Sequence, residues 1–141
     1  MPAQCTYDYA IVRVVPRVER GEFVNVGVIV SCAEQGLLQA AIELDESRLL
    51  ALDPGVDLAG VRAALAAIPL ICKGGQAAGA LGRLSVRERF HWLVAPRSSS
   101  IQTSAVHTGR SNATGALLEE LMRKMVRRPT SPAPKPVQPA A

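Results

Sequence analysis

The chain has 141 residues, of which 48% are hydrophobic and 4% aromatic. This length fits a single domain, and the hydrophobic content excludes wholesale disorder and requires a core of mainly aliphatic side chains. The formal net charge is +4, but three of the 16 basic residues, Arg127, Arg128 and Lys135, follow residue 126. The remaining 13 basic and 12 acidic residues leave 1–126 nearly neutral, so we expect no nucleic-acid-binding surface on the domain itself.

The three cysteines, Cys5, Cys32 and Cys72, form neither a CxxC pair nor a cluster with the spacing of zinc ligands. We therefore expect reduced thiols, no metal and no cofactor, in a cytoplasmic protein. The start of the chain lacks the basic-then-apolar pattern of a signal peptide. The apolar stretch 58–72 is too short to cross a bilayer, so we expect no membrane segment.

Three segments near the start of the chain have the composition of β-strands, namely 7–15, 23–32 and 37–44. Short connections containing Gly21 and Gly36 separate them. Because connections this short join antiparallel neighbours, we expect the sheet to begin with a three-stranded antiparallel meander.

Alternation along these strands predicts what each face of the sheet carries. In the second strand every second residue from Val24 to Val30 is a valine, which predicts one apolar face. The opposite face of the three strands then carries a polar set. Its members are Arg13, Asn25, Gln39 and Glu43. This set is either a buried Arg13–Glu43 pair with an amide completing the network, or a pocket for an anionic or polar ligand.

Helices are predicted to follow the meander. Residues 47–52 have the pattern of a short helix, and Asp57 is placed to cap a longer helix that extends to Ile68. Pro69 is predicted to end or kink that helix. The glycine-rich stretch 73–82 is predicted to be a loop.

The second half of the chain is predicted to add two short strands, 90–95 and 101–106. A last helix reaches Val126, capped by Thr114 or Asn112. Acidic residues early and basic residues late in this segment suit the helix dipole.

The chain is thus predicted to have one α+β domain, 1–126, and a disordered tail, 127–141. The domain is an antiparallel sheet that begins with the meander and packs against two or three helices. The tail holds five of the ten prolines, a composition typical of an extended segment outside a core.

Charged residues crowd the first strand connection, where Arg17, Glu19, Arg20 and Glu22 fall within six residues. This segment is either a solvated loop with weak local ion pairs or a recognition loop. The sequence alone leaves both interpretations open.

Residues 89–110 hold both histidines, the only tryptophan and a run of hydroxyl side chains. Arg97 followed by Ser98 could hold a phosphate through guanidinium and hydroxyl donors, and His107 beside Thr108 could supply an acid–base group. The plainer interpretation is an ordinary loop with a surface histidine. Since neither a GxSxG nor a phosphate-loop motif is present, we expect no catalytic residues to be identifiable.

The chain resembles the bacterial domain-of-unknown-function family 3037 (DUF3037) in two stretches, YDYAIVRVVPRVERGEFVNVGVIV and ERFHWLVAPRSSSIQTSAVHTG. The likeness covers residues 7–126 and implies a small bacterial cytoplasmic protein. The family is associated with genes that lie beside genes for HipA-like kinases, so the resemblance implies such a kinase as a candidate partner. The family name states no activity, so no catalytic role is carried over. The matching polar positions are candidate ligand-binding residues: Arg13, Arg17, Arg20, Glu22, Asn25, Arg89, Arg97, Ser98, His107 and Thr108.

Two functional hypotheses follow. The first is a non-catalytic binding or accessory protein, with a HipA-like kinase as partner. The alternative is a small enzyme acting on a phosphate-containing substrate, including nucleic acid, which requires Arg17, Arg97 and His107 to converge in one pocket. A third hypothesis is nucleic-acid binding by the basic tail alone. The oligomeric state has no signal in the sequence.

Overall fold

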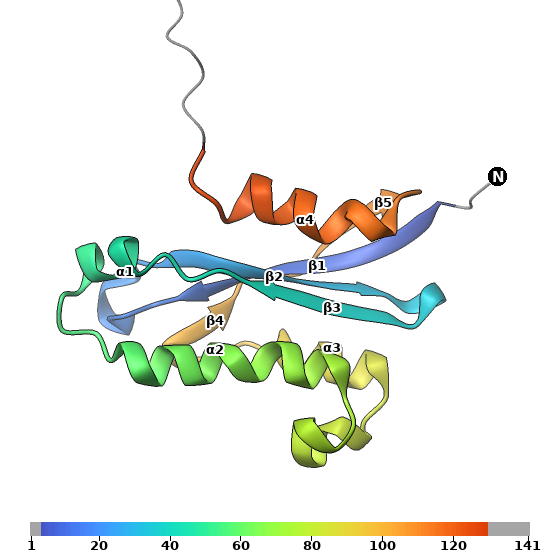
Figure 1. Ribbon diagram of the computed structural model, residues 1–141, viewed down its shortest axis with the longest axis horizontal. Coiled ribbons are helices and arrows are strands. Elements are labelled where there is room, and N and C mark those ends of the chain that lie inside the picture. Colours follow the sequence, from blue (N-terminus) through green and yellow to red (C-terminus); the bar gives the residue numbers. More distant parts are fainter. Residues whose placement is uncertain (1–3, 130–141) are drawn as a thin grey trace, which may run out of the picture.

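A computed structural model describes residues 4–129 of the chain. It confirms the α+β class: a five-stranded antiparallel sheet lies between α2 and α3 on one face and α4 on the other (Figure 1). The strands are β1 (Cys5–Val14), β2 (Val24–Cys32), β3 (Leu37–Ile42), β4 (Ile101–Thr103) and β5 (His107–Ser111). The helices are α1 (Glu46–Leu52), α2 (Leu58–Lys73), α3 (Val86–Leu93) and α4 (Thr114–Met125), with 3-10 turns at Val18–Arg20, Ala33–Gln35 and Gln76–Arg83.

The sheet begins with the predicted meander, because β2 pairs antiparallel with both β1 and β3. The second half of the chain then pairs with the outer edge of β1. Residues 12–14 of β1 pair with β4, and residues 5–9 pair with β5. The two short strands β4 and β5, from late in the sequence, therefore both pair with the long first strand β1.

The prediction that the valines of β2 share one face is wrong. The register between β1 and β2 shifts by one residue beside Gly27, as in a β-bulge. Val24 and Val26 pack in the core beneath α2, whereas Val28 and Val30 pack beneath α4. The extra residue reverses the alternation halfway along the strand, so both faces of the sheet receive a valine pair.

Each face of the sheet has its own apolar cluster. Beneath α2 and α3 the buried side chains include Leu65, Phe90 and Leu93. Beneath α4 they include Leu121 and Met122. Since a fully buried aliphatic or aromatic side chain contributes roughly 1.5–3 kcal/mol, helices on both faces are needed to cover a sheet that is apolar on both.

Helix α2 begins as predicted and ends later. The Asp57 carboxylate accepts a hydrogen bond from the Gly60 N–H at 3.0 Å, which makes Asp57 the N-cap. Pro69 does not end the helix, which continues to Lys73. Its last turn is stabilised because Arg89 donates hydrogen bonds to carbonyl oxygens there.

The predicted strand 90–95 is wrong, because these residues belong to α3 and the turn that follows it. The Ser85 hydroxyl accepts a hydrogen bond from the Glu88 N–H at 3.2 Å, and the two side chains also contact each other. A serine followed three residues later by a glutamate is the sequence signature of a capping box, which marks the start of a helix. Phe90 and Leu93 then fall on the buried face of that helix.

Smaller differences occur around the remaining elements. Neither Asn112 nor Thr114 caps α4, since its N-cap position is Ala113 and has no side-chain hydrogen bond. The predicted loop 73–82 overlaps the 3-10 turn Gln76–Arg83, and the predicted strand 101–106 is shortened to β4.

The end of α4 is joined to the sheet beyond the predicted domain boundary. Arg127 forms ion pairs with Glu43 and Glu119, and Arg128 pairs with Asp45 at 2.8 Å. Contacts with the domain therefore extend two residues past Val126. The rest of the predicted disordered tail, 130–141, lies outside the described residues.

Cys5 and Cys32 form a disulfide between the start of β1 and the end of β2, with their Cα atoms 6.8 Å apart. This finding corrects the expectation of three reduced thiols. The two positions are 27 residues apart in sequence, and only the register of the meander brings them together. Cys72 is a free, buried thiol.

Within the part of the chain that the structure describes, no single helix is long and apolar enough to cross a bilayer. Helix α2 and the turn Gln76–Arg83 have sufficient length and apolar composition only when taken together, and they are bent by 64° relative to each other.

Candidate functional site

A groove of about 610 Å³ runs along α2 on the face of the sheet opposite α4. One wall is α2, where Gly60, Ala64 and Ala67 line the groove. These positions lie near one another on a helix surface, and their small side chains leave space above the helix. The other wall consists of the end of α3 and the segment 97–101. The groove is therefore formed by small residues on a regular helix and needs no distortion of α2.

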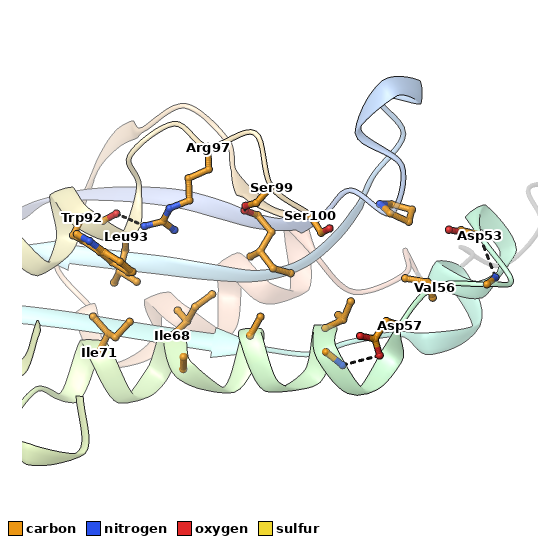
Figure 2. Close-up of a pocket in the computed structure, with 17 residues that line it drawn as sticks. Asp53, Val56, Asp57, Ile68, Ile71, Trp92, Leu93, Arg97, Ser99 and Ser100 are labelled. Carbon is orange, nitrogen blue, oxygen red and sulfur yellow. Dashed lines mark hydrogen bonds between the residues drawn. The ribbon is translucent and has the colours of Figure 1, made fainter. Parts of the chain in front are cut away.

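The two ends of the groove differ in chemistry, as Figure 2 shows. Trp92 lies at one end and is 43% exposed. The Arg97 guanidinium lies 4.3 Å from the centre of the indole ring and donates a hydrogen bond to the Trp92 carbonyl at 2.7 Å. This cation–π contact and hydrogen bond fix the orientation of a large, exposed aromatic side chain.

Asp53 and Asp57 lie at the opposite end. The Asp53 carboxylate is nearly buried, accepts a hydrogen bond from the Gly55 N–H at 3.0 Å, and lies 3.5 Å from the Arg17 guanidinium. Asp57 is exposed while it caps α2. The groove thus offers an apolar floor with an acidic end and an aromatic end.

The backbone segments 13–25 and 89–108 meet, but their candidate side chains do not form one site. Strand β4 pairs with β1, and the Val15 N–H donates to the Ser100 carbonyl at 2.7 Å. Arg97, Ser99 and Ser100 line the groove. Arg13 and Asn25 lie on the other face of the sheet. Pairing of the two backbone segments therefore does not bring their polar side chains together.

On that other face, Asn25 donates a hydrogen bond from its amide nitrogen to the Met125 carbonyl at 3.1 Å, near the end of α4. Arg13 lies over the Phe23 ring, 4.0 Å from its centre. The Arg13 Nε atom and the Asn25 Oδ1 atom are buried without a hydrogen-bond partner among the described residues. The predicted Arg13–Glu43 pair is wrong, because Glu43 pairs with Arg127.

The charged loop after β1 contains local ion pairs. Arg17 is paired with Glu19 at 3.9 Å as well as with Asp53. Arg20 and Glu22 hydrogen-bond to each other, and both remain partly exposed. Of these residues, only Arg17 approaches the groove, through its contact with Asp53.

Arg89 has a structural role. Its side chain is 7% exposed and donates to the carbonyl oxygens of Leu84, Ile71 and Cys72 at 3.2, 2.7 and 2.7 Å. These bonds engage the guanidinium inside the protein and keep it away from solvent.

The neighbouring Cys72 is also buried. Burial raises the pKa of its thiol to about 11, although the Arg89 charge opposes that shift. This cysteine is therefore not a thiolate nucleophile at neutral pH.

His107 and Thr108 lie on β5, away from the groove. The His107 ring packs against the Tyr9 ring, with 5.3 Å between ring centres and a tilt of 32°. The Thr108 hydroxyl donates to the Asp8 carboxylate at 2.8 Å, and Asp8 also pairs with Arg87. Ser98 is exposed and does not line the groove. The convergence of Arg17, Arg97 and His107 in one pocket, which the hypothesis of a phosphate-processing enzyme requires, is therefore not formed.

The groove-lining residues of α2 were missed in the sequence. The helical pattern predicts this helix without indicating that Ala64 and Ala67 line a groove. The pattern that could have indicated them is a row of small residues at helical spacing beside the buried stripe of the helix.

Among residues 4–129, no group of three or more histidine, cysteine or acidic side chains is placed to hold a metal ion.

In a comparison with protein-family models, the family described as "Protein of unknown function (DUF3037)" matches residues 9–126. This match confirms the resemblance seen in the sequence. No curated protein matches the chain, and no solved structure matches it. The matched region includes both walls of the groove and excludes the proline-rich segment that follows.

Proposed function

The chain belongs to the DUF3037 family, and we propose that it is a non-catalytic binding or accessory protein whose groove along α2 receives a segment of a partner protein. The observation that supports this proposal is the groove itself, with its apolar floor and an exposed tryptophan held in place by Arg97. Exposed, ordered aromatic side chains are enriched at the centres of protein interfaces because they bury a large area at low entropic cost.

The dimensions of the groove suit a peptide segment. From Gly60 to Ile71, α2 rises about 17 Å at about 1.5 Å per residue. An extended strand of about five residues covers that length. Polar side chains along the rim, such as Ser99 and Ser100, could bond to the backbone of such a segment.

The partner that we propose is a HipA-like kinase, as the family resemblance implies, in the bacterial cytoplasm. Groups that a phosphate-processing enzyme would need lie on different faces of the sheet, whereas a docking site needs only the continuous apolar surface that is present. The proposal therefore gives the protein a role in holding or presenting the kinase, with no reaction of its own.

Co-purification from the native host tests the proposal, and α2 provides a matched pair of variants. Ala67 lines the groove, and its exposed neighbour Ala66 does not. We expect wild type and Ala66→Glu to enrich the kinase, and Ala67→Glu to lose about ten-fold in recovery, because a carboxylate would be buried in the interface.

Two outcomes would count against the proposal. If the kinase is never enriched above an untagged control, the partner is wrong. If Ala67→Glu recovers as much kinase as Ala66→Glu, the groove is not the docking site.

The disulfide between Cys5 and Cys32 counts against the cytoplasmic part of the proposal, because cytoplasmic thiols are normally kept reduced. Rapid acid quenching and alkylation of cells, followed by mass spectrometry, would decide this point. A cytoplasmic protein is expected to show alkylated Cys5 and Cys32, and a protein in an oxidising compartment is expected to protect both.

A further inference from the structure

The chain leaves the described fold close to the acidic end of the groove. Arg128 is held by Asp45 at 2.8 Å and by the Ser47 hydroxyl at 2.9 Å, at the start of α1. Helix α1 then leads directly to Asp53. Figure 1 shows the end of α4 and helix α1 on the same side of the molecule. The residues that follow Pro129 therefore start about one short helix away from the groove.

The following segment is long enough to reach and fill the groove. Helix α1 has seven residues, or about 10 Å. Residues 130–141 would span about 37 Å as a polyproline helix at about 3.1 Å per residue. Once about 10 Å of this span has been used to pass α1, the remaining length of the segment exceeds the groove's length of about 17 Å.

The chemistry of this segment matches the groove from end to end. It contains four prolines, one basic residue, Lys135, and no acidic residue. Proline-rich segments bind apolar, aromatic-lined grooves, and their restricted backbone loses little entropy on binding. Lys135 lies seven residues after Arg128, or about 22 Å along a polyproline helix, a span that would bring it near Asp53 and Asp57. Residues 136–141 would then be long enough to extend over the floor towards Trp92.

We propose that residues 130–141 occupy the groove of their own chain, with Lys135 at the acidic end and the later prolines against Trp92. This inference rests on the proposed function, since it makes the same groove the partner's site. A partner must then displace the segment. The family match ends at residue 126, so this self-binding would be a property of this chain added to a groove that lies within the matched region.

Trp92 is the only tryptophan, so its fluorescence reports on the groove. The full chain is compared with a chain that ends at Pro129, which keeps every described contact. We expect the full chain to show a lower acrylamide quenching constant and emission at shorter wavelength than the shortened chain. Equal quenching in the two forms would overturn the proposal.

Variants of the full chain test the same claim without truncation. Ala67→Glu and Lys135→Glu are each expected to raise quenching towards the value of the shortened chain, whereas Ala66→Glu is expected to leave it unchanged. Thermal melting checks that each variant is folded. If Ala66→Glu raises quenching as much as Ala67→Glu, or if Lys135→Glu has no effect, the assigned contacts are wrong.

A synthetic peptide of residues 129–141 distinguishes binding within one chain from binding between copies. A short tether gives an effective concentration in the millimolar range, so peptide added to the shortened chain is expected to restore protection at or below millimolar concentration. The quenching constant of the full chain is expected to be independent of protein concentration. A dependence on concentration would assign the groove to a second copy's segment and overturn the proposal.

The two proposals can fail separately. If the shortened chain binds the kinase through the groove but its quenching equals that of the full chain, the self-binding inference fails and the proposed function stands. If quenching differs but neither form binds the kinase, the proposed partner fails and the self-binding inference stands.

Discussion

Three hydrogen bonds engage the guanidinium of Arg89 at the junction of α2 and α3. We predict that Arg89→Met lowers the free energy of unfolding by about 2–4 kcal/mol, because buried carbonyl oxygens at the end of α2 lose a charged donor. Urea denaturation measures this change. Arg83→Met, at an exposed position in the neighbouring 3-10 turn, is the control and is expected to change stability by less than about 0.5 kcal/mol. If Arg89→Met changes the free energy of unfolding only slightly, the structural role of Arg89 is contradicted and a ligand-binding role becomes the better explanation.

Cys72 makes stability depend on pH in the alkaline range. Burial is the main cause that raises the pKa of its thiol from 9.0 to about 11, because it disfavours the charged thiolate. Between these values the unfolded chain loses the proton while the folded chain keeps it. Stability is therefore predicted to fall as pH rises from 9 to 11, by about 2–3 kcal/mol from this group.

Comparison of wild type with Cys72→Ala isolates this effect. The cavity that the substitution creates costs the same at every pH, and the remaining titrating groups are shared. The difference in unfolding free energy between the two proteins is expected to shrink from pH 9 to pH 11. A difference that stays constant over this range would contradict the raised pKa.

At the scale of elements, the bulge in β2 determines on which face of the sheet each valine of the strand is buried. A Cβ atom at Gly27 would lie 2.5 Å from the Ala41 carbonyl oxygen and 2.6 Å from Ile42 Cδ1. Gly27→Ala is therefore predicted to lower the free energy of unfolding by roughly 1–3 kcal/mol through overpacking. Gly115→Ala, in the first turn of α4 with open space around it, is expected to be neutral or stabilising. Equal effects in thermal melts would mean that the bulge tolerates a side chain.

The bulge also shows why the sequence predicted the strands better than their faces. Composition and short glycine-containing connections were sufficient for the meander β1–β2–β3. The alternation of valines predicted one face because nothing local in the sequence distinguishes Gly27 as a bulge site from an ordinary strand glycine. The constraint is the backbone of β3, which approaches Gly27 from a neighbouring strand.

The prediction of a strand at 90–95, where the structure has the end of α3, fails for a different reason. Short apolar runs such as 90–95 are compatible with either a strand or a helix, and the deciding signal was the capping box that begins at Ser85. For the candidate site, the sequence singled out Arg97 and Ser98 as a possible phosphate-binding pair, whereas in the structure Arg97 lines the groove and Ser98 does not. It could not indicate that Arg97 and Arg13 face opposite sides of the sheet, because that depends on the pairing of β4 with β1.

At the scale of the whole molecule, the disulfide joins the beginning of the sheet to the end of β2. Closing a chain segment of 27 residues restricts the unfolded state, so the double variant Cys5→Ser, Cys32→Ser is predicted to lose about 2–4 kcal/mol of stability. Urea denaturation with and without a reducing agent measures this loss. Reduction should destabilise wild type and leave the double variant unchanged. Equal midpoints for wild type under both conditions would contradict the disulfide.

The two faces of the sheet differ in what covers them. On one face α4 is attached through Asn25, Arg48 and the ion pairs of Arg127 and Arg128. On the other face α2 carries both the main core and the open groove. Several candidate polar residues, such as Asn25 and Arg89, therefore make contacts within the fold, and the groove is the surface that we propose for a partner.

Amide hydrogen exchange with and without the purified HipA-like kinase tests this assignment most directly. The chain that ends at Pro129 is used so that the groove is open. We predict that the kinase slows exchange in residues 60–71 and 92–101 and leaves β5 and α4 unchanged. Protection confined to β5 or α4, with none along α2, would contradict the assignment of the groove as the binding site.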